Sequence, residues 1–309
     1  MLAPLHRPAS CSLTRRWTHY RNMQFLFRVL SRWPLWLLHW IGGGLGWLAY
    51  ALSPSYRRRF RANAAQAGLP WSAVRPAVAQ AGRMAAELPW LWMRPHDADL
   101  GARARVEGAD CVDAAHRAGR GLIFLTPHLG CFEVTAQVYA ERFGERYGAL
   151  TALYRPPRKA ALRDLVDTAR HRPGLKTAPA TLAGVRQMIR ALKAGEAVGL
   201  LPDQVPPEGM GVWAPFFGKP AYTMTLAARL AHQTGAHIVL AWGERLPRGA
   251  GYVVRFSPLE EAVPHEAESA AACINRAMER LILQCPGQYL WGYHRYKNPR
   301  TAPADGVLA

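Results

Sequence analysis

His128 and Glu133 are two residues whose types and spacing could do acid–base chemistry. The imidazole follows the apolar run GLIFLT at 121–126, which predicts a buried strand, and the carboxylate falls in the first turns of the helix expected next. If both residues were on one helix, their five-residue spacing would point the side chains apart. Because His128 is expected in the turn before the helix, the Glu133 carboxylate can reach its ring. Glu133 would then fix the tautomer through one ring nitrogen, while the other nitrogen removes a proton from a hydroxyl group.

The residues around this pair favour direct transfer between two bound substrates. Gly130 would let the backbone turn closely, and free N–H groups at the helix start could stabilise an oxyanion. The chain has no G-x-S-x-G motif, and Cys131 is placed to pack against the helix start, so no covalent acyl-enzyme is expected. Neither His-x-x-x-His nor paired Cys and His ligands occur, so no metal site is predicted. Taken alone, the spacing also fits a surface histidine near a glutamate at a helix start.

Apolar runs of strand length alternate with helical patterns along the chain. The expected strands cover 121–126, 149–154, 197–201, 237–242 and 252–256, and the expected helices lie near 131–143, 158–171, 181–194, 222–234 and 266–284. This alternation predicts an α/β fold with a central, mostly parallel sheet covered by helices. The short LPRGAG segment predicts that the last two strands form an antiparallel pair at one edge.

Residues after the second and third of these strands could join His128 in one cleft, because ligands of open α/β sheets bind beyond the carboxyl ends of the strands. Arg155 follows the second strand, and Asp203 and Gln204 follow the third. Arg155 has a planar charged fork that suits a phosphate or a developing oxyanion. A lone arginine after a strand is more often a surface residue, and Asp203 could equally cap its own turn.

Positive charge and apolar residues are concentrated near the N-terminus. The chain has 39 Lys+Arg against 21 Asp+Glu, and its first 86 residues contain 12 Arg and no acidic residue. Residues 33–56 carry no charge and as a helix would extend about 36 Å, enough to cross a hydrocarbon core of about 30 Å. Four tryptophans there and arginines at both ends predict a membrane anchor that either spans the bilayer or lies in its interface. A buried core helix is the third interpretation.

The composition excludes several other classes of protein. A hydrophobic fraction of 50% with 11 Trp and 11 Tyr excludes intrinsic disorder. The five cysteines are widely spaced without a C-x-x-C pair, so a disulfide framework is not expected. Only five basic residues are Lys and no nucleic-acid motif is present, so we expect no nucleic-acid partner.

Several sequence blocks together resemble one known family. TPHLGCFEV at 126–134 is similar to the H-x4-[DE] box of glycerolipid-type acyltransferases. With LYRPPR at 153–158, the stretch 192–221, LAHQTGA at 230–236 and PGQYLWGYHRYK at 286–297, the chain resembles the lipid A biosynthesis acyltransferases of Gram-negative bacteria. The resemblance runs in order from the hydrophobic segment to Lys297.

The resemblance implies an enzyme that moves a fatty acyl chain from an acyl carrier protein thioester to a hydroxyl of a membrane glycolipid, a lipid A precursor, on the cytoplasmic face of the inner membrane. The acyl chain would arrive on phosphopantetheine, with no other cofactor. His128 would be the general base and Glu133 its partner. Arg155 would stabilise the oxyanion or a phosphate, and Asp203 would support the site. An acidic carrier protein and an anionic membrane both suit the basic surface.

Six further residues are candidates for contact with substrate. These are Gly130, Tyr154, Gln204, Phe216, Phe217 and Arg295. Phe216 and Phe217 could form the wall of an acyl groove, although core aromatics are the commoner outcome. Arg295 could contact the lipid surface, or belong to a structural C-terminal strand. Cys131 and Phe132 stand where many relatives have Asn and Trp, so pocket shape and chain-length preference are open.

These observations divide the chain into four segments. They are a basic, disordered leader at 1–22, a hydrophobic membrane anchor at 23–56, an acyltransferase domain at 57–300 and a tail at 301–309. Residues 57–93 are expected to form helical pieces broken at prolines, and Met23 would be a natural alternative start.

Two other functions stay open. One is the same chemistry on a lysophospholipid, an ornithine-type lipid or a phosphoinositide mannoside, and the other is a non-catalytic basic protein that binds membrane surfaces.

Overall fold

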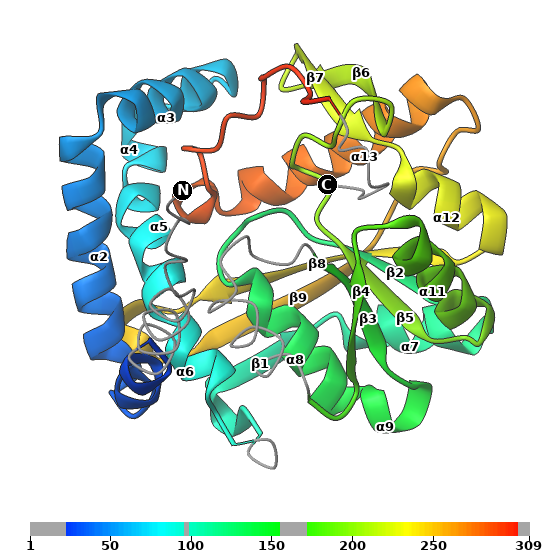
Figure 1. Cartoon of the computed structure of the whole chain (residues 1–309), viewed down its shortest axis with the longest axis horizontal. Coiled ribbons are helices and arrows are strands. Elements are labelled where there is room, and N and C mark those ends of the chain that lie inside the picture. The colour runs from blue at the N-terminus through cyan, green and yellow to red at the C-terminus, as the bar shows by residue number, and fades with distance from the viewer. Residues whose placement is uncertain (1–22, 96–98, 155–171, 302–309) are drawn as a thin grey trace, which may run out of the picture.

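A seven-stranded sheet forms the centre of the protein (Figure 1), in the order β1-β9-β8-β2-β5-β3-β4. The structure, a computed structural model, describes residues 23–95, 99–154 and 172–301. The strands are β1 (Ala104–Glu107), β2 (Leu122–Leu125), β3 (Leu150–Tyr154), β4 (Leu175–Pro179), β5 (Ala197–Leu200), β8 (His237–Arg245) and β9 (Tyr252–Pro258). The predicted α/β fold with a mostly parallel sheet is confirmed. The expected leader and the expected helix at 158–171 lie outside the described residues.

The five predicted strands are confirmed, but the edges of the sheet differ from the prediction. β8 and β9 are antiparallel, with Ala241 opposite Phe256, as expected. They do not form an edge, because β1 pairs in parallel with β9 and β4 pairs in parallel with β3. β1 and β4 are short and partly exposed, so they lack the apolar run by which the central strands are recognised.

Helices cover both faces of this sheet, because alternate residues of the central strands point in opposite directions. Ile123 and Leu125 of β2 belong to the core on the side of α11 (Leu182–Lys193), α12 (Leu226–Thr234) and α13 (Ala267–Gln284). Leu122 and Phe124 belong to the core on the side of α7 (Ala109–Arg117) and α8 (Phe132–Arg142). A short helix, α9 (Gly144–Tyr147), follows α8, and 3-10 turns occupy Gly101–Arg103, Pro247–Gly249 and Pro286–Gln288.

A separate hairpin lies above α13 (Figure 1). It consists of β6 (Gly211–Phe216) and β7 (Lys219–Met224), joined by a two-residue turn in which Phe217 has φ +47° and Gly218 has φ +73°. Positive φ at both positions matches the turn to the twist of the two strands. The expected helix at 222–234 therefore begins later, at Leu226, because Tyr222 to Met224 complete the hairpin.

The N-terminal segment packs along the same body as a layer of helices. Residues 23–31 are helical, and α2 (Leu35–Leu52), α3 (Pro54–Gln66), α4 (Trp71–Val74), α5 (Pro76–Ala86) and α6 (Leu88–Trp92) follow. The prolines break residues 57–93 into short helices, as predicted. Gly42 and Gly46 of α2 contact Gly82 of α5 so closely that a Cβ atom on Gly82 would lie 1.9 Å from the Gly42 carbonyl oxygen. Glycine is thus required for this approach of the two helices.

One face of α2 is therefore packed and the other is exposed. It is the one described helix that is long and apolar enough to cross a membrane, and 39% of it is buried. Its exposed face is rich in large apolar residues: Trp36, Trp40, Leu45, Trp47, Leu48 and Leu52. An apolar helix that is only partly covered by the protein is weak evidence for membrane attachment.

Candidate active site

His128 and Asp203 meet at the carboxyl end of the sheet. They follow β2 and β5, which are adjacent parallel strands with Leu125 paired to Leu200. The Nδ1 atom of His128 lies 2.8 Å from Oδ1 of Asp203, and Oδ2 of Asp203 accepts the His128 backbone N–H at 2.9 Å. One carboxylate thus holds both the ring and the backbone of the histidine.

Asp203 is buried and stays ionised. Burial by itself would raise the pKa of this carboxyl group, but the charge of His128, the two hydrogen bonds from His128 and the charge of Arg295 together lower the pKa below its usual value. An ionised Asp203 accepts the Nδ1–H, which leaves the Nε2 lone pair of His128 available as a base. The Gln204 side-chain nitrogen lies 2.9 Å from that Nε2 atom. Gln204 thus contacts the ring nitrogen that Asp203 leaves free.

The two ring nitrogens of His128 contact residues that follow β5: Nδ1 contacts Asp203 and Nε2 contacts Gln204. Glu133 lies in the first turn of α8 and accepts a hydrogen bond from the Trp92 indole at 3.4 Å. The carboxylate at Nδ1 is therefore that of Asp203, and the role of Glu133 as a partner of His128 stays a prediction. Asp203 reaches the ring because β5 lies directly beside β2.

The turn after His128 is held by the backbone of β8. Gly130 has φ +58°, and a Cβ atom there would lie 2.0 Å from the carbonyl oxygen of Gly243. The Gly130 N–H donates to the Gln288 carbonyl oxygen, and the Cys131 N–H donates to that of Gly243. These two amides are already bonded within the protein, and Gly130 is buried. Burial raises the pKa of the Cys131 thiol well above its usual value, which keeps it protonated.

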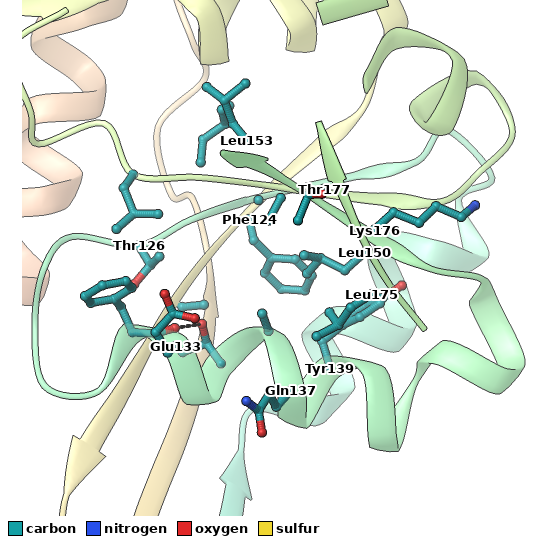
Figure 2. A pocket seen from close by; sticks show the side chains of 18 of the residues that line it. Phe124, Thr126, Glu133, Gln137, Tyr139, Leu150, Leu153, Leu175, Lys176 and Thr177 are labelled. Atoms are coloured by element: carbon teal, nitrogen blue, oxygen red, sulfur yellow. Dashed lines mark hydrogen bonds between the residues drawn. The ribbon is translucent and has the colours of Figure 1, made fainter. Parts of the chain in front are cut away.

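A mostly apolar cavity of about 90 Å³ opens next to this turn, between α8 and strands β2, β3, β4 and β5. Figure 2 shows Glu133 and Thr126 at one end of the cavity, with Lys176 and Leu175 at the other. Phe132 lines the cavity and also contacts the His128 ring, with ring centroids 4.9 Å apart. The imidazole is thus next to an apolar space.

A sequence model of the bacterial lipid A biosynthesis acyltransferase family matches residues 6–298. The chain belongs to this family. It is 30% identical over 190 residues to the lipid A biosynthesis lauroyltransferase of Escherichia coli K12, an alignment that covers 60% of this chain and 59% of the relative. It is 28% identical over 195 residues to the palmitoleoyltransferase of the same organism and to a lipid A biosynthesis acyltransferase of Shigella flexneri, with 62% of this chain and 61% of each relative covered. The alignments thus span about three fifths of each relative.

In this member of the lipid A acyltransferase family, the other suggested substrate contacts lie away from the cavity beside α8. Phe216 ends β6 and Phe217 lies in the hairpin turn, where they contact Tyr296 and Trp291. Together with Arg295 they line a second, small cavity, and neither aromatic lines the cavity beside α8. Tyr154 is buried at the end of β3 and is also not among the described residues that line it. Arg155 lies outside the described residues.

Arg295 is buried, which corrects the expectation that it contacts the lipid surface. It is 2% exposed, and its guanidinium donates to the Tyr222 carbonyl oxygen and to the Thr223 hydroxyl, both at 2.7 Å. Its charge also contributes to the low pKa of Asp203. Arg295 therefore supports the site from within the core.

The cavity lining is the part of the site that sequence reasoning missed. Among the members that it did not single out are Phe124, Thr126, Tyr139, Leu150, Leu175 and Phe256. Five of them belong to four different strands and one helix, and Thr126 directly follows β2. The alternation along β2 was the available signal, because it puts Phe124 and Thr126 on the same face.

Proposed function

We propose that this protein transfers a fatty acyl chain from an acyl carrier protein thioester to a hydroxyl of a lipid A precursor. Membership of the family and the names of the two Escherichia coli relatives, a lauroyltransferase and a palmitoleoyltransferase, support an acyl transfer of this kind. The single observation that carries the proposal is the imidazole of His128, held by a buried carboxylate beside an apolar cavity.

His128 is the general base of the proposed reaction. The acceptor hydroxyl displaces the Gln204 amide and donates its proton to Nε2, and the hydroxyl oxygen forms a bond to the thioester carbonyl carbon. The carbon–sulfur bond then breaks, and the phosphopantetheine thiolate takes the proton from the imidazolium. Asp203 stabilises the positive imidazolium between these two steps, as the buried carboxylate does in other catalytic histidine pairs. The carrier protein delivers the only cofactor required.

Glu133 acts on the acceptor in this proposal. Its carboxylate lines the end of the cavity nearest to His128, and it lies in the first turn of α8, where the helix dipole favours a negative charge. There it accepts hydrogen bonds from sugar hydroxyls and holds the reacting one near Nε2. Arg155 stays the predicted partner of the oxyanion or of a lipid phosphate.

The cavity between α8 and the sheet receives the acyl chain. Ala136, on the cavity side of α8, is one of its smallest lining residues. Ala136→Leu adds three carbons and should exclude the end of a long chain, with a loss of about 0.8 kcal/mol, or fourfold in kcat/KM, for each methylene excluded. The ratio of rates on long and short acyl donors, measured on the same variant, reports the change. An unchanged ratio would place the chain elsewhere.

The exposed face of α2 attaches the protein to the cytoplasmic face of the inner membrane. Since its other face packs on α5 along its length, the helix lies in the interface in this proposal instead of crossing the bilayer. Trp36 and Trp40 suit the headgroup level, and the arginines of α3 suit anionic lipids. The basic N-terminal region also attracts the acidic carrier protein.

The test combines a purified reaction with a lipid analysis. His128→Ala should reduce acyl transfer by about 10²–10⁴-fold with the fold retained, whereas His237→Ala, an exposed histidine at the opposite end of the sheet, should not. Mass spectrometry of lipid A from a strain lacking the gene should show one missing acyl chain. Unchanged lipid A with an altered phospholipid or ornithine-lipid profile would assign another acceptor, and full activity of His128→Ala would remove the histidine from the mechanism.

A further inference from the structure

Arg245 and Glu87 form a buried ion pair beneath the N-terminal helices. Arg245 is the last residue of β8, and Glu87 lies between α5 and α6. The guanidinium donates from Nε to Oε2 at 2.8 Å and from Nη2 to Oε1 at 2.5 Å, and the two side chains are 1% and 0% exposed. His39 of α2 and the Tyr252 hydroxyl also contact Oε2, at 2.9 and 3.0 Å.

Burial by itself would raise the pKa of Glu87, but the charge and hydrogen bonds of Arg245 together with His39 lower that pKa to about 2. The pair is therefore charged at neutral pH. A buried ion pair is often no more stabilising than apolar residues of the same size, because desolvation offsets the attraction.

The guanidinium and its backbone also hold the turn that follows His128. Nη2 of Arg245 donates to the Gly130 carbonyl oxygen at 3.1 Å. The Gln288 side chain bridges the Arg245 backbone in both directions, at 2.9 Å each, and the Gln288 carbonyl oxygen accepts the Gly130 N–H at 3.1 Å. Both polar groups of Gly130 are thus fixed by Arg245 or by a residue bound to it.

We propose that Arg245 is a positioning residue of the acyl transfer, which fixes the turn carrying His128 through the carbonyl of Gly130. Glu87 holds the guanidinium at the angle that this contact needs. The expected effect on kcat rests on the proposed function, whereas the fixing of the turn rests on the contacts of Arg245 alone. A planar fork is required, because it contacts Glu87, Gly130 and Gln80 at once, which a single ammonium group does not reproduce.

The experiment compares Arg245→Lys with Tyr252→Phe. The lysine keeps a charge for Glu87 but loses the contact with Gly130, whereas the phenylalanine removes one hydrogen bond from the same carboxylate and leaves the turn untouched. Arg245→Lys should lower kcat by roughly 10–100-fold with little change in KM, as expected when a catalytic group is misplaced. Tyr252→Phe should leave kcat within about twofold of the original protein.

Hydrogen exchange supplies a readout that does not depend on activity. In Arg245→Lys the amides of 128–134 should exchange at least tenfold faster, while those of α13 keep their protection; Tyr252→Phe should leave both unchanged. If Arg245→Lys does not fold, Glu87→Gln with Arg245→Gln replaces the pair with two neutral amides and carries the same expectation. Faster exchange in a protein that transfers no acyl group would refute the proposed function but keep the positioning. Unchanged exchange, or an equal fall in kcat for both single variants, would overturn the positioning role.

Discussion

Asp203 holds His128 by two atoms at once: Oδ1 lies 2.8 Å from the ring Nδ1, and Oδ2 accepts the backbone N–H at 2.9 Å. The two residues are 75 positions apart in the chain and meet because β2 and β5 are neighbours in the sheet. Since the same carboxylate fixes the backbone and the ring, the imidazole has little freedom to turn away from the cavity.

Asp203→Asn should affect the chemical step more than Glu133→Gln. An amide in place of the carboxylate loses the negative charge that stabilises the imidazolium, so we expect kcat to fall by about 10²–10⁴-fold. Glu133→Gln should mainly raise the KM for the acceptor lipid, by about tenfold, because a hydrogen-bond acceptor to the sugar is weakened. Steady-state kinetics with varied acceptor separates the two effects, and the reverse pattern would return the catalytic role to Glu133.

Glu87 should make the free energy of unfolding depend on pH in the acidic range. The folded-state pKa of about 2 is below the ordinary value of 4.5, so the folded state binds fewer protons than the unfolded state between these values. The stabilisation that the lowered pKa of Glu87 provides is complete above about pH 4.5 and is lost as the pH falls toward 2. Urea unfolding should therefore show a free energy of unfolding about 2 kcal/mol lower at pH 3 than at pH 6 from this group. In Glu87→Gln with Arg245→Gln that part of the pH dependence should vanish; a persisting difference would assign it to other carboxylates.

Gly130→Ala should destabilise the protein more than Gly209→Ala. Both glycines have positive φ, at +58° and +79°, but a Cβ atom on Gly130 would lie 2.0 Å from a β8 carbonyl oxygen, whereas nothing lies within 4 Å of one on Gly209. Strain alone predicts a loss of about 1–2 kcal/mol at Gly209, and the clash must add to that at Gly130. Thermal unfolding of the two variants measures the difference, and equal melting temperatures would show that the turn can move away from β8.

Trp36→Gln with Trp40→Gln should weaken membrane binding. The two indoles are 56% and 73% exposed on α2, and each should contribute on the order of 1 kcal/mol when partly buried in lipid. Flotation on anionic liposomes should show binding reduced roughly tenfold or more. The control is Trp213→Gln, a tryptophan that is 46% exposed on β6, and an equal loss in that variant would mean that the face of α2 is not the membrane contact.

The sequence was enough to predict which residues lie at the carboxyl ends of the central strands, but it did not predict which of them contact one another. His128, Asp203 and Gln204 were predictable because apolar runs identify β2 and β5, and polar residues at strand ends face the ligand edge of a parallel sheet. The edge strands β1 and β4 were not, since short, partly exposed strands leave no apolar pattern. The hairpin was missed because its strands contain Gly, Pro and Lys, which are poor strand formers.

By itself, the sequence determined the α/β fold, the apolar N-terminal helix and the strand ends that carry the chemistry, because hydrophobic periodicity is a local property. Only the tertiary structure decided that Asp203 bonds to His128, since strand order in a sheet is set by packing between distant segments. It also decided that one face of α2 packs on α5 through Gly42 and Gly82, and that Arg245 reaches the turn at Gly130. These contacts join residues more than 35 positions apart, where spacing along the chain carries no information about distance in space.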